Sequence, residues 1–222
     1  MKFAIIVFPG SAGETDCYHV LNNVLGQDVE YVWYKEEALD KYDAVILPGG
    51  ATYGDYLRPG ALAKFAPVMK ALAEFADRGG LVLGIGNGFQ ILTEAGLLPG
   101  NLLMNETTKF LCDTKELKVA RDDTAFTNCF KTDDLIKLPI AHGYGRYFCD
   151  EALLQELTDN GQIVFTYANP AESGAIAGII NKKGNILGMM PYPERYSEEI
   201  LGGTDGLKVF NSIIAWLEEV KA

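Results

Sequence analysis

The sequence predicts an α/β sandwich, in which helices cover both faces of a central, mainly parallel sheet. Along the first half of the chain, short apolar runs that end in glycine or proline alternate with longer amphipathic stretches. This alternation is typical of parallel strands joined by helical crossovers. The length of 222 residues and the 48% of hydrophobic residues suit one globular core. We therefore expect a single domain over residues 1–222.

The elements of the first half follow from these runs. Residues 3–8 form a continuous apolar run that ends at Pro9-Gly10, as expected of a strand buried on both faces. Apolar residues at helical spacing over 17–25 then predict a helix, with Asp16 as a candidate N-cap. The same signals predict further strands at residues 29–33, 44–47 and 81–85, and helices over 61–78 and from residue 89 onward.

The second half of the chain has a different pattern. Residues 102–148 are rich in short alternating stretches, which predict an antiparallel, strand-rich insertion. Three further strands are expected at 163–167, 176–180 and 185–190, with a hairpin turn at residues 181–184 between the last two. A closing helix is expected over residues 207–220.

The charge balance restricts the partners. Acidic residues outnumber basic ones 30 to 19, for a net charge of -11, so the chain should repel nucleic acids. No apolar run reaches the roughly 18 residues of a membrane helix. The first apolar run stops at Phe8, too early for the apolar region of a signal peptide. We expect a cytoplasmic protein that binds neither nucleic acid nor membrane.

Cysteines and histidines are few and scattered. The four cysteines include no C-x-x-C pair, and they are too few for a disulfide scaffold. The two histidines, His19 and His142, lie far apart in sequence. Because typical ligand spacings are absent, we expect neither a metal site nor a cofactor.

Gly84–Gly88 (GIGNG) lies where a strand is expected to turn into a helix. A dinucleotide fingerprint, G-x-G-x-x-G, fails because residue 89 is Phe and because the strand is the fourth in the chain. A nucleophile elbow would lift residue 86 above the sheet edge and aim the following N–H groups at the same cavity. Gly86 carries no nucleophile, so a turn that needs glycine for geometry alone remains the alternative.

Long runs around this turn resemble the PurQ-type glutaminase subunit of phosphoribosylformylglycinamidine synthase, a class I glutamine amidotransferase. The resemblance covers nearly the whole chain and implies the flavodoxin-like α/β sandwich of that family. The runs that carry it are residues 7–11 (VFPGS), 47–50 (LPGG), 53–58 (YGDYLR), 87–100 (NGFQILTEAGLLPG), 140–143 (IAHG), 187–191 (LGMMP) and 202–206 (GGTDG).

The resemblance implies a Cys-His-Glu triad, and this chain departs from it at two of the three positions. Gly86 stands where the family has cysteine, in a Gly-Ile-Cys-Asn-Gly-Phe-Gln context. Tyr192 stands where the family has the histidine of Pro-His-Pro-Glu, and Glu194 alone matches. Glycine offers no nucleophile, and a phenol with an ordinary pKa near 10 is a poor general base at neutral pH.

Further departures surround the same pocket. Ala51-Thr52 replace Phe-Ser after Gly50, and Tyr144 replaces the acid of His-Gly-Glu-Gly. Residues 11–16 read SAGETD, where the family has Gly-Ser-Asn-Cys-Asp. Several changes around one pocket favour natural divergence over a single engineered substitution. We expect Tyr144 and Tyr192 to narrow or fill the glutamine pocket.

Other features of the site are implied by position. The family's oxyanion hole corresponds to backbone N–H groups near Gly50 or Ala51 and at Asn87, which do not depend on the missing side chains. Gln90 corresponds to a residue beside the substrate, or it is a helix-capping or solvated residue. His142 is a site residue or a satisfied structural histidine. No cysteine is a convincing replacement nucleophile: Cys17 should be buried, and the other three are remote in sequence.

Three functions follow from the resemblance and its departures. The first is a degenerate, pseudo-glutaminase subunit that docks on a synthase-like large subunit without hydrolysing glutamine. The second is a repurposed module that binds a small molecule or anion in the old glutamine pocket. The third is a working glutaminase subunit of purine biosynthesis that releases ammonia. Site chemistry ranks the first above the others.

Overall fold

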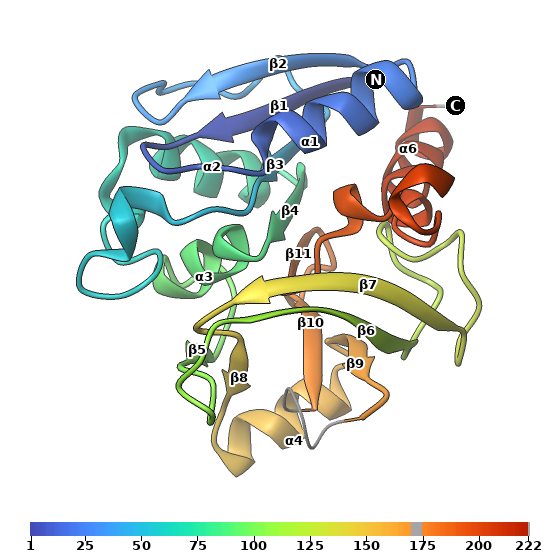
Figure 1. The fold of residues 1–222 in the computed structure, drawn as a ribbon. Coiled ribbons are helices and arrows are strands. Elements are labelled where there is room, and N and C mark those ends of the chain that lie inside the picture. The colour runs from blue at the N-terminus through green and yellow to red at the C-terminus, as the bar shows by residue number, and fades with distance from the viewer. Residues whose placement is uncertain (170–174, 222) are drawn as a thin grey trace.

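The computed structural model describes residues 1–169 and 175–221. A nine-stranded sheet runs through it in the order β2-β1-β3-β4-β11-β10-β9-β6-β7 (Figure 1). Its strands are β1 (Lys2–Val7), β2 (Asp28–Trp33), β3 (Ala44–Leu47), β4 (Leu81–Ile85), β6 (Leu111–Val119), β7 (Leu135–His142), β9 (Ile163–Tyr167), β10 (Ile176–Ile180) and β11 (Ile186–Met189).

The type of strand pairing changes once across this sheet. From β2 to β11 neighbouring strands are parallel, and from β11 to β7 they are antiparallel. A second, antiparallel pair joins β5 (Asn101–Leu103) and β8 (Arg146–Phe148). These pairings confirm the predicted α/β fold, the strand-rich insertion over residues 102–148 and the hairpin between β10 and β11.

Helices cover both faces of the sheet. The α-helices are α1 (Glu14–Tyr18), α2 (Pro67–Asp77), α3 (Asn87–Glu94), α4 (Glu151–Asp159) and α6 (Leu207–Lys221). A π-helical segment, η1 (His19–Val24), continues α1. Four short 3-10 helices are η2 (Thr52–Asp55), η3 (Ala63–Phe65), η4 (Pro193–Arg195) and η5 (Glu199–Leu201).

The core lies in two layers, because successive side chains of each strand point to opposite faces. On β1, Phe3 and Ile5 pack towards α1 and α6, whereas Ala4 and Ile6 pack towards α2 and α3. The loops at the carboxyl edge of the sheet are therefore attached to strands that are packed on both faces.

Several sequence predictions about helices are wrong in detail. The helix expected over 61–78 is interrupted, because Ala66 is extended (φ -67°, ψ 145°) before Pro67 and α2 begins at that proline. Proline disfavours helical backbone at the residue that precedes it. Asp16 is not an N-cap: Gly13 holds that position, and Asp16 lies inside α1. Helix α3 begins at Asn87 rather than at residue 89. Helix α4, capped by Asp150, was not predicted.

Helix length and polarity bear on membrane insertion. Across residues 1–169 and 175–221, no helix combines the length and the apolar character needed to span a bilayer.

Candidate functional site

The strand-to-helix turn after β4 has the backbone of an elbow. Gly86 adopts φ 52° and ψ -107°, a conformation that side-chain-bearing residues rarely tolerate. A Cβ on Gly88 would lie 2.0 Å from the Leu47 carbonyl oxygen, and one on Gly84 would lie 2.5 Å from Leu92 Cδ1. The flanking glycines are therefore required because strand and helix pack too closely for a side chain.

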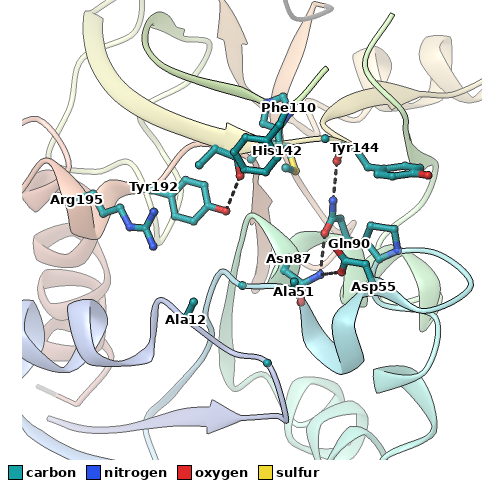
Figure 2. A pocket seen from close by; sticks show the side chains of 16 residues that line it. Ala12, Ala51, Asp55, Asn87, Gln90, Phe110, His142, Tyr144, Tyr192 and Arg195 are labelled. Carbon is teal, nitrogen blue, oxygen red and sulfur yellow. Dashed lines mark hydrogen bonds between the residues drawn. The ribbon is translucent and has the colours of Figure 1, made fainter. Parts of the chain in front are cut away.

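Tyr192, which follows β11, occupies the space above this elbow. A Cβ on Gly86 would lie 2.6 Å from Tyr192 Oη, and one on Gly49 would lie 2.3 Å from Tyr192 Cε1. The phenol donates a hydrogen bond to the carbonyl oxygen of Ala141 at 3.1 Å (Figure 2). The Arg195 guanidinium lies 4.5 Å from the centre of the ring. The ring thus fills the volume that a side chain at position 86 would need.

Burial fixes the protonation state of this phenol. Loss of solvent, reinforced by the nearby Glu194 carboxyl, raises the pKa of Tyr192 to about 12. The hydroxyl therefore stays protonated at neutral pH and cannot act as a general base there.

Glu194 is a buried carboxyl without a hydrogen-bond partner. Its side chain is 2% exposed, and both carboxyl oxygens lack a donor within the described part of the chain. Arg195 is close but donates its Nε–H to Asp16 at 3.1 Å. Desolvation raises the pKa of Glu194 to about 8, so the group is largely protonated at pH 7. The phenol, bonded to Ala141, does not supply the partner that an imidazole would have offered.

A cavity of about 520 Å³ opens in front of Tyr192. It lies beyond the carboxyl ends of β1, β3, β4 and β11, where parallel α/β sheets bind ligands. Figure 2 shows Tyr192 and Arg195 on one side of it and Asp55 on the other. Its lining residues are Gly10, Ala12, Gly50, Ala51, Asp55, Pro59, Asn87, Gln90, Phe110, Ala141, His142, Gly143, Tyr144, Met190, Tyr192 and Arg195.

A hydrogen-bond network crosses the floor of this cavity. Gln90 Nε2 donates to the Tyr144 carbonyl oxygen at 2.6 Å, and Asn87 Nδ2 donates to Gln90 Oε1 at 2.8 Å (Figure 2). The Thr52 N–H in turn donates to Asn87 Oδ1 at 3.1 Å. Gln90 is buried, and both ends of its amide are bonded within the chain, so it is not a solvated residue. The network ties the loops after β3 and β7 to helix α3.

His142, at the end of β7, is buried at the cavity wall. Its Nδ1 lies 3.0 Å from Asn105 Oδ1, and Asn105 Nδ2 also donates to the His142 carbonyl oxygen at 2.8 Å. Burial lowers the pKa of His142 to about 4, so the imidazole is neutral at pH 7. Since Asn105 Oδ1 is an acceptor, we assign the proton to Nδ1. Nε2 is then an acceptor without a partner among the described residues.

The other predicted site residues, Gly50, Ala51, Asn87 and Tyr144, also line the cavity, but two of them differ from expectation in their contacts. The Tyr144 ring extends away from Tyr192 in Figure 2, so the two phenols do not close the cavity together. The Ala51 N–H donates to the Gly10 carbonyl oxygen at 2.9 Å and is not free for an oxyanion. Gly50 and Asn87 both line the cavity beside it.

Sequence reasoning missed three charged or aromatic members of the wall. Asp55 is half-buried, and desolvation raises the pKa of its carboxyl. Phe110 is 67% exposed at the cavity mouth, and Arg195 stacks on Tyr192. Asp55 lies in the YGDYLR run and Arg195 directly follows Glu194, so both stood beside residues already identified.

The cysteines lie elsewhere. Cys17 is buried in α1, and burial raises the pKa of its thiol well above the ordinary value. Cys112 and Cys129 are exposed and Cys149 is half-buried. Over the residues that the structure describes, no cysteine lines the cavity, and no group of three or more potential metal ligands comes together.

Comparisons with known protein families and with solved structures both match this chain to glutamine amidotransferases. Residues 1–203 match the CobB/CobQ-like glutamine amidotransferase domain. A chain in the structure of PurLQS from Thermotoga maritima is 44% identical, with 97% of this chain and 98% of that chain covered and a TM-score of 0.90.

Two more distant structures share the fold alone. A putative GMP synthase protein from Thermoplasma acidophilum is 16% identical, with 100% and 96% coverage and a TM-score of 0.66. A glutamine amidotransferase from Thermotoga maritima is also 16% identical, with 100% and 85% coverage and a TM-score of 0.60. On the family match and the 44% identity, the chain belongs to the glutamine amidotransferase family and is a PurQ-like member of its class I branch.

Proposed function

We propose that this chain is a PurQ-like subunit of purine biosynthesis that docks on a synthase-type partner without hydrolysing glutamine. One observation is the main support for the proposed loss of glutamine hydrolysis: the Tyr192 ring occupies the space that a side chain at position 86 would need. A substrate amide therefore meets a neutral phenol where the family resemblance implies a thiolate.

The chemistry of the site supports this proposal. Amide hydrolysis through an acyl-enzyme needs a nucleophile at the elbow and a base that also protonates the leaving ammonia. Gly86 supplies no nucleophile, and Tyr192 holds its proton up to a pKa of about 12. Loss of one member of such a triad typically reduces the rate by several orders of magnitude, and two are replaced here.

The docking half of the proposal is supported by likeness and by exposure. The 44%-identical relative was solved as part of a PurLQS assembly and matches over almost the whole of both chains. Tyr56 and Leu57 are 68% and 74% exposed and lie in the chain between Asp55 and Pro59, which line the cavity. Arg58 beside them donates through Nη2 to Glu94 at 2.7 Å, which fixes the loop against α3. Exposed aromatic and arginine side chains on a fixed loop are common interface anchors.

Analytical ultracentrifugation of the chain with the synthase-type chain of the same organism tests the docking. We expect a complex at tens of micromolar. If no complex forms at that concentration, the subunit function fails.

A second candidate function is a small-ligand module, and the charge pattern of the cavity favours it. Arg195 and Asp55 both line the cavity and lie at opposite sides of it in Figure 2. Calorimetric titration with L-glutamine, L-glutamate and inorganic phosphate tests it. Binding of one of these, together with no partner complex, would favour the module over the subunit.

A further inference from the structure

The 3-10 helix η5 presents two aliphatic side chains to solvent. Ile200 is 91% exposed and Leu201 is 47% exposed. No other large apolar side chain in the described ranges is as exposed as Ile200. We call residues 198–203 the η5 knob. The knob follows η4, whose Arg195 lines the cavity, after only two intervening residues.

The knob is held in one backbone conformation. Glu198 and Gly203 pair across its base as an antiparallel bridge, and the Leu201 N–H donates to the Glu198 carbonyl oxygen at 2.9 Å. The Tyr196 ring packs beneath the turn so closely that a Cβ on Gly203 would lie 2.3 Å from its Cε1 atom. The exposed side chains therefore stand on a turn supported from below.

A second attachment fixes the knob to the body of the protein. Glu198 Oε1 lies 2.7 Å from His19 Nε2, on the π-helical segment η1. A segment already fixed in its bound conformation loses little entropy when a partner covers it. Because Ile200 is almost wholly exposed, its side chain adds little to folding, and packing does not explain its place.

Charge indicates what would cover the knob. Glu198 and Glu199 directly precede Ile200, and the whole chain carries a net charge of -11. Glu198 already has His19 as a partner, but a wholly apolar surface would leave the Glu199 carboxylate desolvated without a partner, which is unfavourable. A complementary surface combines an apolar pocket for the two aliphatic side chains with basic groups at its rim.

We propose that the η5 knob is an interface anchor that inserts Ile200 and Leu201 into an apolar pocket, rimmed by lysine or arginine, on the synthase-type chain. This inference rests on the proposed docking function and adds a specific contact to it. Glu199 pairs with a basic group of that rim, whereas Glu198 stays bonded to His19.

The test compares variants of exposed residues in binding to the synthase-type chain. Ile200→Asp removes the apolar anchor, and Val220→Asp is the matched control, because Val220 is 71% exposed near the end of α6. We expect Ile200→Asp to raise the dissociation constant at least tenfold and Val220→Asp to leave it within twofold of the wild-type value. Glu199→Lys should weaken binding and reduce its dependence on salt.

The possible outcomes distinguish failure of the anchor role of the η5 knob from failure of the docking function. Wild-type binding with no more than a twofold loss for Ile200→Asp would overturn the anchor while leaving the subunit function intact. No wild-type binding would overturn both. Circular dichroism and urea unfolding of each variant should match the wild type, since the altered side chains are exposed.

Discussion

Residues 86 and 192 constrain each other, because their side chains would occupy one volume. Tyr192 Oη lies 2.6 Å from the position of a Cβ on Gly86, far inside van der Waals contact. Gly49 is constrained by the same ring, since a Cβ there would lie 2.3 Å from Tyr192 Cε1. The side chains at positions 86 and 192 are thus sterically coupled rather than independent.

Gly86→Cys alone should therefore destabilise the chain. The new side chain meets Tyr192 and forces a positive φ on a non-glycine residue, which together cost about 2 kcal/mol or more. Tyr192→His should relieve the first effect but not the second. Urea unfolding of the two single variants and the double variant gives the coupling energy. We expect at least about 1 kcal/mol in favour of the double variant, and additivity of the single effects would refute the shared volume.

Glu194 gives stability a pH dependence whose sign can be stated. Its pKa is about 8 in the folded chain and close to the ordinary value of 4.5 when unfolded. Between these values the folded state binds more protons than the unfolded state, so stability falls as pH rises from 4.5 towards 8. The slope is at most about 1.4 kcal/mol per pH unit.

Glu194→Gln should remove that slope. From pH 7 to 8 the wild type should lose stability relative to Glu194→Gln, because the amide cannot ionise. His142 affects stability at lower pH than Glu194 does. Its pKa is lowered from 6.5 to about 4 in the folded chain, so its contribution to the free energy of unfolding is lost as pH falls from 6.5 to 4. Urea unfolding of the wild type and of Glu194→Gln at pH 7.0, 7.5 and 8.0 measures the difference in their stability. Parallel slopes would show that Glu194 is already ionised at pH 7.

At the scale of elements, the strands were predictable and the helix boundaries were not. Runs such as 44–47 and 81–85 are apolar on both faces, and this pattern fits β3 and β4 as observed. The break before α2 depended on Pro67, whose effect on Ala66 the apolar stripe does not reveal. Helix α4 has one buried residue, Leu157, and it is as amphipathic as α6 but much less apolar overall than α2, α3 or α6.

The site was predictable in its positions but not in its contacts. The resemblance located Gly86, Tyr192 and Glu194, and the structure places the Tyr192 ring over Gly86 and the Glu194 carboxyl near Tyr192. It could not indicate that the Ala51 N–H bonds Gly10, or that the Tyr144 ring extends away from Tyr192. Such details depend on loop backbones that close over the cavity only in the folded chain.

The loop of η2 should matter for docking and little for folding. Tyr56 is 68% exposed, so Tyr56→Ala should change the free energy of unfolding by less than about 0.5 kcal/mol. On the proposed interface it should weaken the complex with the synthase-type chain about tenfold or more. Ultracentrifugation and urea unfolding together check both halves. Unchanged binding would exclude this loop from the interface.

At the scale of the whole molecule, one sheet connects everything the site needs. The parallel strands carry the elbow and the glycine loops, and the antiparallel strands bring His142 and the carbonyl oxygen of Ala141 to the same cavity (Figure 1). Because both core layers share this sheet, we propose that residues 1–222 form a single domain. Gly86 and Tyr192 stand at the positions where the family resemblance implies cysteine and histidine, which fits the proposed subunit that is kept for association.

Ammonia release from glutamine, measured with the purified chain and its synthase-type partner together, tests the central claim most directly. We expect no turnover above the background of the partner alone, and no labelling of residue 86 by a diazoketone analogue of glutamine. The Gly86→Cys, Tyr192→His double variant provides the comparison for a site with both groups restored. Wild-type turnover at an ordinary enzymatic rate, about 1 per second or faster, would contradict the account and establish a working glutaminase.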